Sequence, residues 1–352
     1  MKQVLKSAVT LIATAVAAAV AASAMSVQAQ EITLKVSHFW APQAMAPTKV
    51  IGPWCDKINK ESGGKLKCQI FPAMSLGGTP AQAFDQAKDG VADIVYTLPG
   101  YTAGRFPLME VFELPFMGLT AEASSQAAWE YYLTTPAVQK EFAGVKPLAF
   151  HTHDEGYVHS KDKQIKTMAD LKGLKMRAPT RQTNKLLAKL GATPVAMPLP
   201  AIPDAVSKGV IDGFLLPWEV IPSVKLHEMV KFHSETDPKE RALYEAVFIM
   251  AMNPAKYESL PPELKKVIDN NSGAALVKQI GKTWDEAALP GRKAAEDHKN
   301  TFYMIPASEL ANWRAASAPL YDEWVAEATA KGHDGKALLA KAQALMSKYE
   351  KK

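Results

Sequence analysis

The chain has 352 residues, of which 47% are hydrophobic and 22% are charged. This length and composition are typical of a globular protein with about two domains. The formal net charge of +5 is small and its charges are scattered along the sequence, which argues against a protein that binds nucleic acid.

Residues 1–29 have the features of a secretory signal peptide. Lys2 and Lys6 form a charged start, residues 8–22 are almost wholly apolar, and small or short residues precede a cleavage site after Ala29. The alternative is an uncleaved membrane anchor, but the apolar core is short for a span. We therefore expect an exported protein whose mature chain begins near Gln30.

Strands and helices alternate in the first part of the chain. Alternating apolar side chains predict strands over residues 32–37 and 66–71, and an apolar run predicts a third over 91–96. Helices are expected between them over residues 47–62 and 80–90. This alternation indicates a parallel α/β unit.

The chain has two cysteines, Cys55 and Cys68. Ile51, Cys55 and Ile58 recur at helical spacing, so Cys55 is expected to face the core. Cys68 lies on the strand that follows this helix, and the helix must pack on a face of that strand's sheet. For an exported protein, the sequence leaves a disulfide and two buried free thiols as equal alternatives.

A dense apolar group follows the first α/β unit and is expected to lie in the core. Its members are Phe112, Leu114, Phe116 and Met117. Thr120 then begins a predicted helix, in which it is expected to act as the N-cap.

The strand–helix pattern returns in the middle of the chain. Strands are predicted over residues 174–178, 193–197 and 210–216, with a helix after each of the first two. Arg177 and Trp218 lie at strand ends, and ligands of such sheets bind beyond the carboxyl ends of the strands. An arginine and an aromatic side chain at one rim suit a small organic anion.

Two segments, residues 145–153 and 244–252, are expected to cross between the units and to form a hinge. The chain from residue 262 onward is expected to be helical, with breaks near Pro290 and Pro306. The predicted division is lobe I, residues 30–150 with about 244–285, and lobe II, residues 151–243 with about 286–352.

Four segments carry a resemblance to a known family. They read ESGGKLKCQIFPAMSLGG from Glu61, DGVADIVYTLPGY from Asp89, DLKGLKMRAP from Asp170, and GATPVAMP from Gly191 followed by GVIDG. In order and spacing they resemble the extracytoplasmic solute-binding proteins of tripartite ATP-independent periplasmic (TRAP) transporters, the dicarboxylate-binding-protein family.

The resemblance implies a two-lobed periplasmic binding protein fold of the α/β class. Each lobe would be a mainly parallel sheet flanked by helices, with hinge crossings, a helix that spans both lobes and a long helical C-terminal part. It also implies a periplasmic location and the TRAP membrane permease subunits as partners. We further expect a monomer.

In that family the arginine of the G-L-K-x-R motif binds the substrate carboxylate, and here this residue is Arg177. A guanidinium fork matches a carboxylate with two parallel hydrogen bonds. Many members that bind polar acids have a second arginine about twenty residues earlier, where this chain has none and offers His153 or Tyr157. The departure argues against a dicarboxylate or a sialic acid.

The remaining candidate contacts share a position at the ends of predicted strands, and most of them are aromatic. They are Phe39, Trp40, Tyr96, Pro99, Tyr101, Met197 and Trp218. Taken singly, each fits packing as well as ligand contact. Taken together, they suit an aromatic or apolar monocarboxylate.

Two functions remain open: a binding protein that delivers an organic acid to a permease, and a periplasmic enzyme that acts on a carboxylic acid. The sequence has no G-x-S-x-G, P-loop, dinucleotide-binding or Cys-x-x-Cys motif. His151, His153 and His159 lie near Asp154 and Glu155, but their spacing matches no zinc motif. We therefore expect a binding protein without a cofactor or metal.

Overall fold

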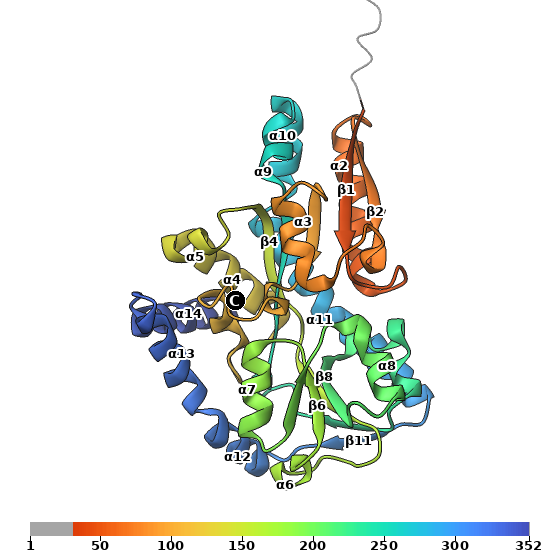
Figure 1. Ribbon diagram of the computed structural model, residues 1–352, viewed down its shortest axis with the longest axis vertical. Coiled ribbons are helices and arrows are strands. Elements are labelled where there is room, and N and C mark those ends of the chain that lie inside the picture. Colours follow the sequence, from red (N-terminus) through yellow and green to blue (C-terminus); the bar gives the residue numbers. More distant parts are fainter. Residues whose placement is uncertain (1–30, 352) are drawn as a thin grey trace, which may run out of the picture.

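The computed structural model describes residues 31–351. The chain forms two β-sheets flanked by helices, and the sheets follow one another along the long axis of the molecule (Figure 1). The expected α/β class is therefore confirmed. The expected signal peptide, residues 1–29, lies outside the described residues.

The first sheet has five strands in the order β2-β1-β3-β10-β4. Every strand except β10 runs in the same direction, because β1 is parallel to β2 and β3 while β10 is antiparallel to β3 and β4. The strands are β1 (Ile32–His38), β2 (Leu66–Phe71), β3 (Ile94–Thr97), β4 (Lys146–Thr152) and β10 (Val247–Met252). The central strands β3 and β10 are buried along their whole length, which explains their unbroken apolar sequences.

The second sheet has six strands in the order β11-β9-β5-β8-β6-β7. Here β5 alone runs against its neighbours β8 and β9. The strands are β5 (Gly156–Ser160), β6 (Lys175–Ala178), β7 (Thr193–Ala196), β8 (Gly213–Pro217), β9 (Phe232–Glu235) and β11 (Thr301–Met304). Both sheets are mainly parallel, as expected.

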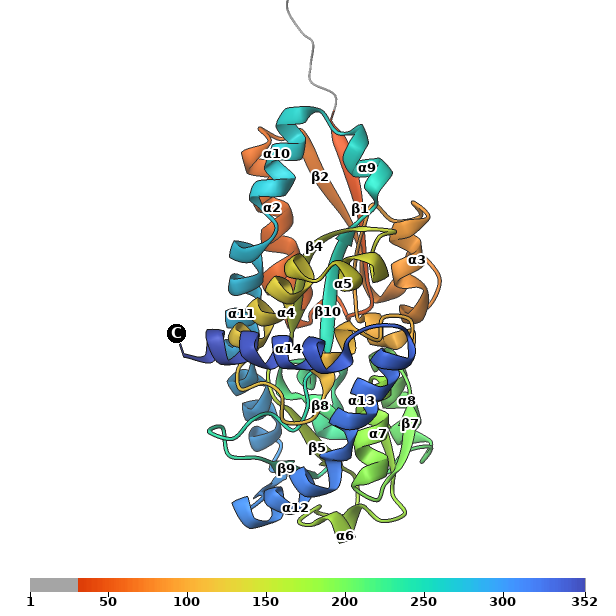
Figure 2. The ribbon, with the colours of Figure 1, turned by 90° about the vertical axis from the view of Figure 1, so that its left-hand side faces the viewer.

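The helices flank these sheets, and the last three wrap around the outside (Figure 2). They are α2 (Gly52–Glu61), α3 (Ala83–Lys88), α4 (Ala121–Thr134), α5 (Pro136–Glu141), α6 (Met168–Leu171), α7 (Arg181–Lys189), α8 (Ile202–Ser207), α9 (Pro254–Ser259), α10 (Pro262–Asn270), α11 (Ala274–Asp297), α12 (Ala307–Ser317), α13 (Pro319–Ala330) and α14 (Gly335–Glu350). No helix within residues 31–351 is long and apolar enough to cross a bilayer.

Two strands begin about three residues later than the sequence predicts, at the starts of β3 and β8. The residues before them close the preceding helices instead. Gly90 and Gly209 adopt positive φ angles of 76° and 66°, and the Val210 N–H donates back to the Ala205 carbonyl at 2.9 Å. This arrangement is the glycine C-cap of a helix. The residues that close the helices are therefore ones that the apolar pattern had assigned to the strands.

Helix α11 runs beside both sheets (Figure 2). It packs on α4 and on the short turn η7 (Trp218–Val220). The predicted break near Pro290 is wrong, because α11 continues through this residue. The next residue, Gly291, allows the close packing: a Cβ there would lie 2.0 Å from the Trp218 carbonyl oxygen.

The N-terminus of α4 is capped from two directions. The Thr120 hydroxyl accepts the Ala123 N–H at 3.2 Å, as expected. The Asp285 carboxylate of α11 accepts the N–H groups of Ala121 and Glu122 at 2.7 and 3.0 Å. Since both caps satisfy N–H groups that the helix leaves unpaired, they fix α11 against α4. The apolar group that precedes α4 is buried, as expected.

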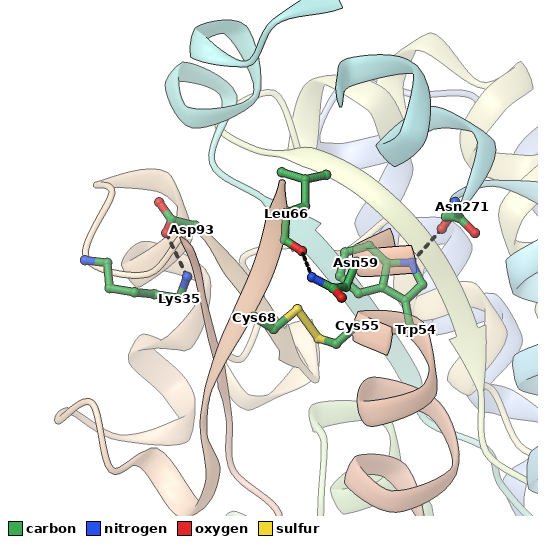
Figure 3. The surroundings of a disulfide bond; sticks show 8 residues. All are labelled: Lys35, Trp54, Cys55, Asn59, Leu66, Cys68, Asp93 and Asn271. Atoms are coloured by element: carbon green, nitrogen blue, oxygen red, sulfur yellow. Dashed lines mark hydrogen bonds between the residues drawn. A yellow bond between two sulfur atoms is a disulfide. The ribbon is translucent and has the colours of Figure 1, made fainter. Parts of the chain in front are cut away.

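The two cysteines form a disulfide, with their Cα atoms 5.8 Å apart (Figure 3). This resolves the two alternatives that the sequence left open. The bond ties α2 to the edge strand β2, and the Asn59 side chain adds a hydrogen bond to the Leu66 carbonyl at 2.8 Å. The Trp54 indole of the same helix donates to the Asn271 carbonyl at 2.7 Å, so α2 is anchored on both sides.

The chain passes between the sheets at residues 153–155, and it returns at residues 236–246. They overlap the predicted crossings, residues 145–153 and 244–252, only at residue 153 and at residues 244–246, because most of each predicted segment forms a strand of the first sheet, β4 or β10. The exact division into lobe I and lobe II stays a prediction, but each sheet falls almost entirely within one of the two. We use the two names in this sense below.

Candidate functional site

A small cavity of about 30 Å³ lies between the two sheets. Its walls come from the ends of β1, β4 and β8 and from the start of β10. Because β10 is antiparallel to its neighbours, its first residues meet their carboxyl ends. The lining residues are Phe39, Trp40, Leu98, Tyr101, His153, Arg177, Leu199, Leu216, Pro217, Glu219, Val220, Ala246 and Phe248.

Arg177 lies at the end of β6 and is only 1% exposed. Its Nε donates to the Met197 carbonyl and its Nη1 to the Leu215 carbonyl, both at 3.0 Å. A guanidinium has five N–H groups, so most of them stay available. No ion pair joins Arg177 to an acid anywhere in residues 31–351. A buried cation without a counterion is costly unless a ligand supplies the charge, so the arrangement suits an anion.

Two tyrosine hydroxyls lie near this guanidinium. Tyr101 accepts the Leu199 N–H at 3.1 Å, a bond that joins the two lobes across the cavity. Burial raises the pKa of Tyr101, while the neighbouring Arg177 lowers it. Tyr244 is buried, and burial raises its pKa well above the usual range, although the nearby Arg177 opposes this shift. The Tyr244 hydroxyl has no hydrogen-bond partner within the described residues.

Sequence reasoning placed Tyr244 only on a crossing segment and missed its proximity to Arg177. No local pattern could have revealed it, because the two residues lie on different elements. Its unpartnered hydroxyl has a hydrogen to offer to an anion beside the guanidinium.

His153 lines the cavity with both ring nitrogens occupied. Its Nδ1 bonds the Asp154 carbonyl, and its Nε2 accepts the Ala246 N–H at 3.0 Å. Burial lowers the pKa of His153 to about 4, with the nearby Arg177 contributing in the same direction and the Asp154 carbonyl opposing it. The imidazole is therefore neutral near pH 7 and offers the cavity only its ring.

An aromatic wall faces the arginine. Phe39 stacks on Trp40 with ring centroids 4.2 Å apart, and Trp40 stacks on Phe248 at 5.5 Å. These rings come from the end of β1 and from β10. A flat apolar ligand can pack against such a surface with good dispersion contacts.

Five of the predicted contacts do line the cavity: Phe39, Trp40, Tyr101, His153 and Arg177. The other five do not lie among its lining residues, and their ligand contacts stay predictions. Those five are Tyr96, Pro99, Tyr157, Met197 and Trp218.

The five other residues have evident structural surroundings. The Tyr96 hydroxyl bonds the His151 ring, and its own ring packs edge-on behind Trp40. Pro99 borders a neighbouring small pocket, while the Met197 carbonyl holds Arg177 in place.

Trp218 turns away from the cavity into lobe II. Its indole donates to Glu235 at 2.9 Å, and its ring packs edge-on against His159 and His233. Tyr157 lies against it with ring centroids 6.2 Å apart.

The histidines of the β4–β5 region take separate roles. His159 pairs with His233 at 2.7 Å between their Nδ1 atoms, whereas His151 bonds Tyr96. Over the described part of the chain, no three histidine, cysteine or acidic side chains are grouped so that they could hold a metal ion.

Known proteins resemble this chain in sequence and structure. A family model described as bacterial extracellular solute-binding protein, family 7, matches residues 36–328. A TRAP solute-binding protein from Rhodoferax ferrireducens, solved with copurified benzoate, is 54% identical with a TM-score of 0.89, over 91% of this chain and 99% of that one.

Two further structures are similar over nearly the whole chain. A TRAP solute-binding protein from a marine metagenome, specific for aromatic acid ligands and crystallised with 3-hydroxybenzoate, is 48% identical with a TM-score of 0.88, over 91% of this chain and 99% of that one. One from Bordetella bronchiseptica with bound (R)- and (S)-mandelate is 28% identical with a TM-score of 0.82, over 90% of this chain and 99% of that one.

Proposed function

Since the chain belongs to the bacterial extracellular solute-binding proteins of family 7 and is a TRAP solute-binding protein, we propose that it captures an aromatic monocarboxylate and delivers it to a membrane permease. Arg177 anchors the carboxylate, and the Tyr101 and Tyr244 hydroxyls assist it. The ring of the ligand packs on the aromatic wall of Phe39, Trp40 and Phe248.

One observation carries this proposal: Arg177 is a buried cation that no carboxylate of residues 31–351 neutralises, and it shares a cavity with stacked aromatic rings. A bidentate bond to a ligand carboxylate would supply the missing charge. The bound ligands of the similar structures support the same ligand class.

We propose that the mature protein works as a monomer in the periplasm, after cleavage behind Ala29. The features of the first 29 residues and the family membership support this location. The TRAP permease subunits are the proposed partners. Carriage rather than catalysis is favoured, because the family consists of solute-binding proteins and because His153 has both ring nitrogens engaged and a lowered pKa.

The ligand enters when the lobes separate. The present cavity of about 30 Å³ is much smaller than the roughly 150 Å³ that holds a benzene molecule. Among the hydrogen bonds that bridge the lobes in this closed form are those from Leu199 N–H to Tyr101 and from Gln43 Nε2 to the Ser223 carbonyl at 2.9 Å. Opening breaks these bonds, and a bound ligand favours their return.

Thermal-shift measurements with a panel of acids test the proposal. Benzoate, 3-hydroxybenzoate and mandelate should each raise the Tm, since a ligand at about 100 times its Kd stabilises the folded state by roughly 2.7 kcal/mol. Benzyl alcohol, which has the ring without the carboxylate, serves as the control and should leave the Tm unchanged. The proposal fails if succinate or malate heads the ranking.

A further inference from the structure

The cavity holds a charged side chain that the binding of a simple carboxylate does not use. Glu219 follows β8 in the short turn η7, and it lines both the cavity and a wider groove of about 540 Å³ between the lobes. Arg177 and Glu219 are the charged residues of the cavity lining, yet no ion pair within 4.0 Å joins them among the described residues. The guanidinium and the carboxyl are therefore held apart within one small space.

The Glu219 carboxyl also lacks a full set of partners. Its Oε2 is buried without a hydrogen bond within the described residues, and the same holds for Oδ1 of Asp154, which is 5% exposed. Burial raises the pKa of both carboxyls, and each also shifts that of the other. Two adjacent buried carboxyls do not both ionise readily, and the pair still has acceptor oxygens without a partner within the described residues.

The Trp284 indole N–H lies beside the Glu219 carboxyl as a donor, and two other polar side chains of the cavity are already occupied. His153 uses both ring nitrogens, and Tyr101 accepts the Leu199 N–H beside Arg177. A ring substituent that points at Glu219 within this cavity therefore meets an acceptor oxygen that lacks a partner among the described residues. A ligand group that donates a hydrogen bond to this buried acceptor should increase the affinity, because an unsatisfied buried acceptor costs free energy.

We propose that Glu219 selects among aromatic acids: it accepts a hydrogen bond from a hydroxyl or amino group on the ring and repels a second carboxylate. This inference rests on the proposed function of the same site. Attraction and exclusion follow from one group, since the Glu219 oxygen accepts hydrogen bonds from O–H and N–H donors, whereas a second ligand carboxylate has no hydrogen to donate to it. A second carboxylate would add a further negative charge beside the Asp154–Glu219 pair.

Titration calorimetry with three kinds of ligand tests this. The ligands are benzoate, the 3- and 4-hydroxybenzoates, and the dicarboxylates isophthalate and terephthalate. The natural protein should bind the better hydroxybenzoate about tenfold more tightly than benzoate, and either dicarboxylate at least about tenfold more weakly. In Glu219→Leu the hydroxybenzoate-to-benzoate ratio should fall to about one or below, because the acceptor is gone.

Glu219→Gln separates hydrogen bonding from charge. The amide keeps an acceptor oxygen, so the preference for the hydroxyl should persist, while the dicarboxylates should gain about tenfold relative to benzoate. The matched control is Glu286→Gln. Glu286 is an exposed acid that lines the outer groove but not the cavity, and its replacement should leave all ratios unchanged.

The outcomes are distinct. Unchanged ratios in Glu219→Leu overturn the inference and leave the proposed function intact. Should that variant fail to fold, the dicarboxylate ratio of Glu219→Gln decides: a gain supports the inference, and no gain overturns it. If the natural protein binds none of these acids, the proposed function falls and the inference with it.

Discussion

Replacing Arg177 with lysine is the sharpest test of the carboxylate anchor. A lysine keeps the positive charge but loses the planar fork that can hold both oxygens of a carboxylate. Arg177 is buried and uses its Nε and one Nη1 hydrogen on backbone carbonyls, so the remaining N–H groups are aimed elsewhere. The variant should therefore lose at least one charge-assisted hydrogen bond to the ligand.

The expected loss of affinity follows from that single bond. A hydrogen bond to a charged group contributes about 1.5–3 kcal/mol, so the Kd should rise by roughly ten- to 150-fold. The unliganded protein should also suffer. The carbonyls of Met197 and Leu215 would lose their donors, at about 1 kcal/mol each, and the Tm should fall by about 3 °C.

Titration calorimetry against the best ligand of the thermal-shift panel measures the effect, at a temperature where the variant is fully folded. Arg105→Lys is the matched control. Its guanidinium binds both oxygens of Asp85, at 2.8 and 2.7 Å, and it does not line the cavity. It should leave the affinity unchanged. A Kd for Arg177→Lys within about twofold of the natural value would refute the anchor role.

Three further predictions concern the hinge, the disulfide and pH. Small-angle scattering should show a smaller radius of gyration at saturating ligand, because closure restores contacts such as the Tyr101–Leu199 bond; an unchanged radius would argue for a permanently closed site. Replacing Cys55 and Cys68 with alanine should lower the free energy of unfolding by about 3 kcal/mol, since the bond closes a short loop. Denaturant titration measures this, and an unchanged midpoint would contradict it. Glu113 has its pKa raised from 4.5 to about 8, chiefly by burial. The folded state therefore binds this proton more tightly than the unfolded state, and the resulting stability is fully present below pH 4.5 and is lost as the pH rises through about 8. Glu113→Gln should flatten this decline in Tm, and an identical pH profile would rule out Glu113 as its source.

Local sequence patterns were sufficient for most of the strands and helices around the cavity and for the position of Arg177. Pro179 cannot donate to a strand ladder, and β6 does end just before it, at Ala178. That placed Arg177 at a strand end, where parallel sheets bind ligands. The helical spacing of Cys55 also placed this residue correctly in the core. Each of these features depends on residues a few positions apart, so the linear sequence contains the necessary information.

Other features depend on which distant segments pack together. Trp218 has the sequence position of a rim aromatic, but its indole finds an acceptor in Glu235 on β9 and turns inward. Helix α11 passes through Pro290, and one residue later Gly291 packs against the Trp218 backbone.

Two polar side chains near Arg177 or in the cavity lining also depend on how distant segments pack together. Tyr244 and Glu219 carry no local signature, and they gain significance only because folding brings Tyr244 near Arg177 and Glu219 into the lining of the same cavity as Arg177. Backbone conformation follows mainly from neighbours in the chain, whereas the direction and the partners of a buried polar side chain follow from contacts that form when the two sheets and α11 come together.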